Sequence, residues 1–137
     1  MYQAGKRTQA LLSEEESELV NVLQALEAKE FPPANMASAR ALLAARGAHA
    51  SKPSVAIVQA AVKIAESFRA LVRGYQAGTE GRLEDALALA KESWALAEKA
   101  KAISPTLQEL ATRVQGIAES MAKQAREMMQ GGAPAAP

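Results

Sequence analysis

Apolar residues recur at spacings of three and four along most of the chain, which is the period of a helix with one buried face. The longest example spans 53–78, where one stripe comprises Ile57, Ala61, Ile64, Phe68, Leu71 and Tyr75. A second stripe beside it comprises Val55, Val58, Val62, Ala65 and Val72. A face that wide predicts a helix that packs against more than one neighbour.

Two further long helices are predicted downstream, over 79–103 and 104–131. Thr79 is a candidate N-cap for the first, and Ser104-Pro105 supplies a cap followed by proline at the first helical position of the second. The short link between them requires the two helices to run antiparallel. Both carry a regular apolar stripe, and we expect its large members to pack in the core: Leu83, Leu87, Trp94, Val114, Ile117, Met121 and Met128. Met129 points away from that stripe.

The N-terminal part predicts two shorter helices. Ser13-Glu14-Glu15-Glu16 is a capping box, so a helix is expected to begin at Ser13 and to stop before Phe31-Pro32-Pro33. The pattern over residues 1–12 is ambiguous, and a short extra turn there is the open alternative. Asn35 is a candidate N-cap for the next helix, and Gly47 suits the position after its last turn. The segment 48–52 is then expected to be a loop leading to Pro53 at the start of the long third helix.

These elements predict an all-α fold, because no stretch alternates apolar and polar residues in the manner of a strand. We expect an up-down antiparallel bundle of five helices, three long and two shorter, with the two shorter helices sharing one position. The bundle forms a single domain over residues 1–130. Residues 131–137, rich in Gly, Ala and Pro, form a tail or a linker.

Composition excludes several kinds of site. The 137 residues contain no cysteine and one histidine, His49, so thiolate chemistry and multi-histidine metal sites are absent. Phosphate-binding glycine loops, HExxH and the Gly-x-Ser-x-Gly elbow are missing too. No apolar run approaches the roughly 20 residues of a membrane span. We therefore expect a non-enzymatic cytoplasmic protein without cofactor or metal.

The 32 alanines bear on how the protein acts. Alanine in the helix seams allows close packing but buries little area per residue, so a partner or a second copy is expected to supply the missing burial. The sequence thus favours a protein-protein interaction, adaptor or assembly subunit that self-associates or binds a protein partner through an exposed apolar stripe. The candidate stripes are the second apolar faces of the third and fourth helices, the latter with Leu89, Leu96 and Ile103.

Charge is unevenly distributed although the net charge is only +1. The segment 31–79 carries six bases and one acid. If the second and third helices pack together, these bases form a candidate contact surface for a partner or an anion, comprising Arg40, Arg46, His49, Lys52, Arg69 and Arg73. Weak nucleic-acid binding by the bases of 40–73 is therefore an alternative function.

His49, followed by Lys52 three residues later on a helical bundle, resembles the phosphoacceptor segment of histidine-phosphotransfer domains. The resemblance implies a signalling function in which His49 carries the phosphoryl group. The chain departs from that family at Pro53, where the family has a small residue, and the family's histidine lies on an exposed helix face.

The segment around Phe68, Leu71, Tyr75 and Gly78, followed by Asp85-Ala86-Leu87, resembles the helical hairpin of a tetratricopeptide repeat. It is also similar to the first hairpin of the three-helix domains that bind microtubule-linked trafficking factors. No second copy follows at the 34-residue period of the repeat, so the resemblance implies a helical hairpin and no particular binding residues.

Overall fold

The structure is a computed structural model that describes residues 2–52 and 54–131. It contains the α-helices α1 (Tyr2–Glu27), α2 (Phe31–Ser51), α3 (Ala56–Thr79), α4 (Leu83–Ile103) and α5 (Gln108–Gly131), with a short 3-10 helix, η1 (Pro105–Leu107), before α5. Within these described residues there is no strand, so the predicted all-α class of five packed helices is confirmed. The predicted first turn at Pro53 and the tail over 132–137 lie outside the described residues.

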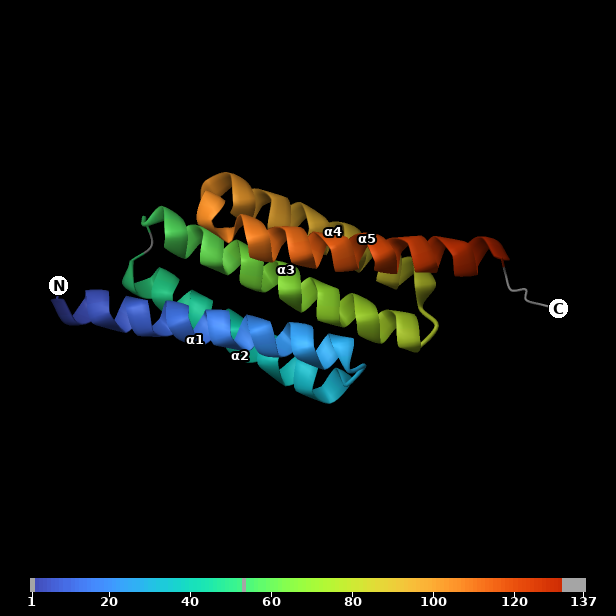
Figure 1. Ribbon diagram of the computed structural model, residues 1–137, viewed down its shortest axis with the longest axis horizontal. Coiled ribbons are helices and arrows are strands. Elements are labelled where there is room, and N and C mark those ends of the chain that lie inside the picture. The colour runs from blue at the N-terminus through green and yellow to red at the C-terminus, as the bar shows by residue number, and fades with distance from the viewer. Residues whose placement is uncertain (1, 53, 132–137) are drawn as a thin grey trace.

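Helix α3 occupies the centre of the molecule and contacts each of the other four helices. In Figure 1, α1 and α2 lie on one side of it and α4 and α5 on the other. Its buried side chains include Ile64, Phe68, Leu71 and Val72, drawn from both of its apolar stripes. The prediction that this helix has several neighbours is therefore confirmed, and the wide apolar face is the reason.

Helix α1 begins at Tyr2, so the predicted start at Ser13 is wrong. Ser13 is an exposed residue in the middle of the helix. Leu11 and Leu12, which precede it, are half-buried, and Leu12 packs against a small cluster formed by α2 and α3. Because these leucines continue the apolar face, the helix gains more by extending through residue 13 than by being capped there.

Helix α2 is also longer than predicted. It begins at Phe31 with Pro32 and Pro33 in its first turn, where a missing N–H costs no helical hydrogen bond. It then continues through Gly47 to Ser51, so neither the cap at Asn35 nor the loop over 48–52 is correct. A Cβ atom at Gly47 would lie 3.1 Å from Leu11 Cδ1. Gly47 therefore permits close approach of α1 and α2 rather than ending a helix.

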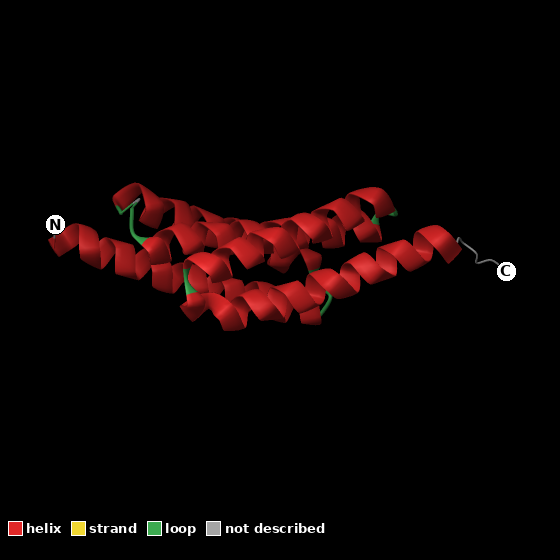
Figure 2. Cartoon of the chain, turned by 90° about the horizontal axis from the view of Figure 1, so that it is seen from above, coloured by secondary structure: helices red, strands yellow, loops and turns green. Residues whose placement is uncertain are grey.

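The five helices have similar lengths, between 21 and 26 residues. The N-terminal pair is therefore not shorter than the others, and it fills two positions of the bundle rather than one. The contact between α1 and α2 is close because the buried apolar residues of α2 are all alanines. Figure 2 shows the helices running along the long axis, with the ends of α1 and α5 extending at opposite ends.

The connections use two residues with positive φ. Lys29 lies between α1 and α2 at φ 60°, and Gly81 lies between α3 and α4 at φ 80°. In each turn a main-chain N–H reaches back to a carbonyl of the preceding helix, from Glu30 to Ala25 and from Arg82 to Ala77, both at 2.8 Å. Thr79 is the last residue of α3, so its predicted role as the cap of α4 is wrong.

Candidate functional site

A groove of about 420 Å³ lies between α2 and α4, where both helices pack on α3. The α3 residues in it follow one helical stripe, Glu66, Arg69, Ala70 and Arg73, which covers about 10 Å of helix. Helix α2 contributes Leu42 and Arg46, and α4 contributes Leu89, Glu92 and Leu96. The groove therefore combines a charged stripe on α3 with leucines on both sides.

Arg69 is held in place by α2. Its Nη1 donates to the main-chain oxygen of Asn35 at 3.3 Å, to the Asn35 side-chain oxygen, and to Ser38 Oγ at 3.1 Å. Partial burial lowers the pKa of Arg69, and the positive charge of Arg73 lowers it further. The guanidinium nevertheless stays charged at any physiological pH. Arg69 thus links α3 to α2 and places a fixed positive charge in the groove.

The other two arginines of the groove, Arg46 and Arg73, are exposed. Ion pairs occur elsewhere in the described residues, yet none of them involves Arg46, Arg69 or Arg73. Glu66 in the same groove is paired instead with Lys63, at 3.9 Å. Within the described residues these three guanidinium groups form no ion pair, although Glu66 and Glu92 also line the groove, so its lining carries three positive and two negative charges. A guanidinium group that has no carboxylate partner can pair with an anionic group.

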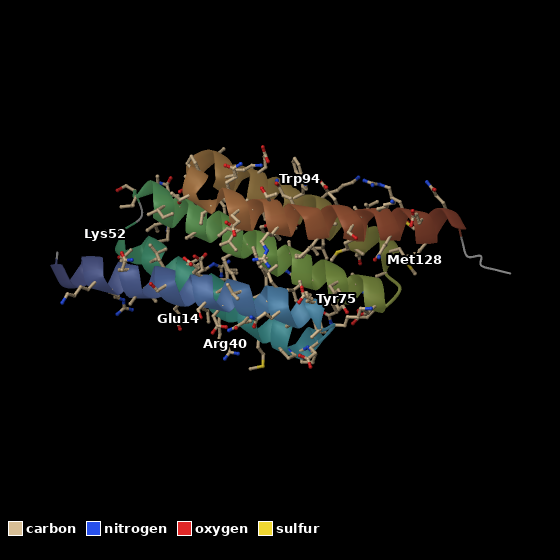
Figure 3. All side chains as sticks on the ribbon, in the orientation of Figure 1. Glu14, Arg40, Lys52, Tyr75, Trp94 and Met128 are labelled. Carbon is tan, nitrogen blue, oxygen red and sulfur yellow. The ribbon has the colours of Figure 1, made fainter. Side chains whose placement is uncertain are left out.

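The structure separates the six predicted contact residues. Arg46, Arg69 and Arg73 line the groove, whereas Arg40 lies on another side of α2 and pairs with Glu18 of α1 at 3.5 Å. Figure 3 shows Arg40 on the side of the molecule opposite Trp94. His49 is exposed in the last turn of α2, three positions after Arg46 and so on a related face. Lys52 caps the same helix, its N–H donating to Ala48.

Sequence reasoning missed the residues that position Arg69. Asn35 was expected to be a helix cap, whereas in the structure it accepts hydrogen bonds from Arg69. Leu89 and Leu96, which line the groove, belong to the second apolar stripe of α4 that the sequence predicts as a candidate binding face. The pairing of Asn35 with Arg69, 34 positions away, carries no signal in the sequence.

Two side chains expected in the core lie at the surface. Trp94 is 38% exposed, and Met128 is more exposed still. Trp94 projects from α4 toward α5 and donates its indole N–H to Glu119 Oε2 at 2.9 Å. Met121 packs against the core, as predicted, and Tyr75 is half-buried. Trp94 lies outside the core beside the buried alanines Ala90, Ala118 and Ala122 of the contact between α4 and α5. Met128 lies near the end of α5, where it lines a surface hollow with Tyr75 and Leu83.

Glu15 is the opposite case, a carboxyl group buried without a partner. It is 4% exposed, and its Oε2 accepts no hydrogen bond from the described residues. Burial raises the pKa of Glu15 to about 8, and the charge of Glu16 contributes to that shift. The group is therefore largely protonated at neutral pH. Its location on α1 does not place it among the lining residues of the groove.

The described part of the chain contains no group of three or more acidic or histidine side chains arranged to hold a metal ion. None of its helices combines the length and the apolar character that crossing a membrane requires. Comparisons with protein-family models, with curated proteins and with solved structures gave no match for this chain.

Proposed function

We propose that the chain is a non-enzymatic interaction subunit whose groove between α2 and α4 binds an acidic amphipathic helix of a partner protein. The proposal includes the up-down antiparallel order of the helices and a cytoplasmic location, both expected from the sequence. In this arrangement α2 and α4 flank the partner helix, and α3 lies beneath it.

One observation carries the proposal, namely three arginines that form no ion pair within residues 2–52 and 54–131 and that lie beside leucines on both flanking helices. A helix that presents leucines at positions i and i+3 or i+4, with glutamates beside them, complements both features. Its leucines would cover Leu42, Leu89 and Leu96, and its carboxylates would pair with the guanidinium groups. Arg69 would enter such a complex already ordered by Asn35 and Ser38, which lowers the entropic cost of binding.

The test measures binding of a labelled helical peptide with leucines and glutamates on one face, by fluorescence anisotropy. The double variant Arg46→Gln/Arg73→Gln should weaken binding by about tenfold, since each exposed ion pair contributes up to about 1 kcal/mol. The matched control Lys99→Gln/Arg113→Gln removes two exposed charges on α4 and α5 and should bind as the wild type does. Equal loss in both variants would show that only net charge matters.

The same titration with a random DNA duplex distinguishes nucleic-acid binding from binding of a partner helix. Phosphate contacts make affinity fall steeply with salt, whereas the leucine contacts of a peptide do not. Tighter binding of the duplex than of the peptide at low salt, lost again in Arg46→Gln/Arg73→Gln, would replace the proposed function with nucleic-acid binding.

A second candidate function, phosphotransfer through His49, is favoured by one observation. His49 is exposed on a helix rather than in the expected loop, as the resemblance to histidine-phosphotransfer domains requires. Incubation with a phosphodonor should then give acid-labile phosphate on the wild type and none on His49→Ala. Labelling that persists in His49→Ala would exclude this function for His49.

A further inference from the structure

A second hollow, of about 300 Å³, lies between α4 and α5. Its lining includes Ala90 from α4 and Ala118 and Ala122 from α5, all three of which are buried. Trp94 contributes to one part of it, and Lys91 and Arg126 contribute the positive charges. Glu92 lines the groove between α2 and α4, whereas Trp94 lines this hollow. The two residues are two positions apart on α4, which places them about 200° apart around the helix, so the two sites use different faces of α4.

The indole of Trp94 is ordered before any partner binds. Its N–H donates to Glu119 Oε2, and this bond engages the only acidic side chain among the lining residues. Next to it, Gln115 donates to the main-chain oxygen of Trp94 at 3.2 Å and to Glu98 Oε1 at 3.0 Å. An aromatic side chain that is exposed and already oriented is typical of the anchor positions of protein interfaces.

The positive side chains of the hollow are in no ion pair within the described residues. Both of them, Lys91 and Arg126, are exposed. The alanines leave space that larger side chains would have filled, so an apolar group can reach the indole ring. The hollow therefore offers apolar contact and positive charge within the same small site.

From this geometry we propose that the hollow binds a segment of a partner protein in which a bulky apolar side chain lies next to an acidic residue. The apolar side chain lies on Ala118 and Ala122 against the Trp94 ring. The carboxylate pairs with Lys91 or Arg126. This site is separate from the groove between α2 and α4, and either can exist without the other.

Trp94 is the only tryptophan of the chain, so its fluorescence reports on this site directly. The probe is the blocked dipeptide N-acetyl-aspartyl-phenylalanine amide, which is expected to change the Trp94 emission in a saturable manner. The asparaginyl analogue has the same shape without the charge, and we expect it to bind about fivefold more weakly. The aspartyl-alanine analogue lacks the ring and is expected to give no saturable change.

Two charge variants complete the test, with far-ultraviolet circular dichroism to verify that each is folded. Lys91→Gln/Arg126→Gln should bind the aspartyl probe as weakly as the wild type binds the asparaginyl probe. The control Lys99→Gln/Lys123→Gln changes the same number of exposed charges on α4 and α5 outside the hollow and should leave binding unchanged. A response that does not saturate, equal affinity for the two probes, or an unaffected Lys91→Gln/Arg126→Gln variant would each overturn the proposal.

Discussion

Ser67 of α3 and Ser93 of α4 exchange hydrogen bonds across the contact between the two helices. The Ser67 hydroxyl donates to the main-chain oxygen of Ser93 at 2.6 Å, and the Ser93 hydroxyl donates to that of Ser67 at 2.8 Å. Both residues are fully buried, and their hydroxyl oxygens lie 3.2 Å apart. Side chains this small let the two helices approach closely, while the hydroxyl groups keep their hydrogen bonds.

Replacing either serine should therefore destabilise the protein in a manner that depends on size. Ser67→Ala removes one buried hydrogen bond and should cost about 1 kcal/mol of unfolding free energy. Ser67→Val adds a branched group where there is no space and should cost about 2 kcal/mol or more. Urea denaturation measures both values, and the exposed Ser120→Ala serves as the control with little expected change. Equal stability of Ser67→Val and the wild type would contradict the close approach.

Gly74 of α3 permits another close contact. A Cβ atom there would lie 2.9 Å from Met121 Sδ and 3.2 Å from Leu89 Cβ. The methionine can move but the leucine Cβ cannot without shifting α4, so Gly74→Ala should destabilise the protein by about 1–3 kcal/mol. Gly116→Ala is the matched comparison, because no atom beyond its chain neighbours and the adjacent backbone of α5 lies within 4 Å of the added Cβ. It should stabilise α5 by about 0.5–1 kcal/mol in thermal or urea unfolding.

Lys29 adopts a left-handed conformation that favours glycine. At φ 60° its side chain adds steric strain, which Lys29→Gly should relieve, raising the unfolding free energy by about 1 kcal/mol. Gly81, at φ 80°, is a glycine that already occupies this conformation. A Cβ atom there would meet no neighbouring atom, so only the backbone conformation disfavours a side chain. Gly81→Ala should lower stability by a similar amount. Chemical denaturation should therefore give changes in unfolding free energy of opposite sign for Lys29→Gly and Gly81→Ala. A destabilised Lys29→Gly variant would contradict this prediction.

The buried carboxyl group of Glu15 should make stability depend on pH. Its pKa rises from 4.5 to about 8 on folding, so the unfolded chain loses this proton at lower pH than the folded one. The contribution of Glu15 to stability is complete below about pH 4.5. It should then decline by about 1.4 kcal/mol per pH unit until the pH reaches about 8.

The glutamine in Glu15→Gln cannot ionise, so this variant does not lose stability in this way. As the pH rises from 5 to 8, the unfolding free energy of Glu15→Gln should therefore increase relative to that of the wild type. Urea denaturation at several pH values measures this difference. The exposed neighbour Glu14 provides the control variant, Glu14→Gln, whose difference from the wild type should change little with pH. A difference independent of pH for Glu15→Gln would show that the carboxyl group is hydrated or paired in solution.

Part of the candidate site was visible in the sequence. The excess of bases over 31–79 identified the region, and Arg46, Arg69 and Arg73 of that set line one groove. Arg40 was assigned to the same surface because its sequence neighbourhood is equally basic, yet Glu18 of α1 pairs with it elsewhere. Local charge composition does not specify on which side of a helix pair a given side chain lies, since that depends on how the helices rotate against each other.

The sequence by itself determined the helical class, the packing of the helix with two apolar stripes against more than one neighbour, and the ends of the last three helices to within a few residues. These follow from periodicity and from proline and glycine, which act through the local backbone. The tertiary structure decided the length of α1 and α2, the role of Gly47 and the exposure of Trp94. Each of these three features depends on a side chain from another helix, as Gly47 depends on Leu11 of α1. Alanine-rich contacts are compatible with several pairings of the helices, and only the packing of the complete molecule distinguishes between them.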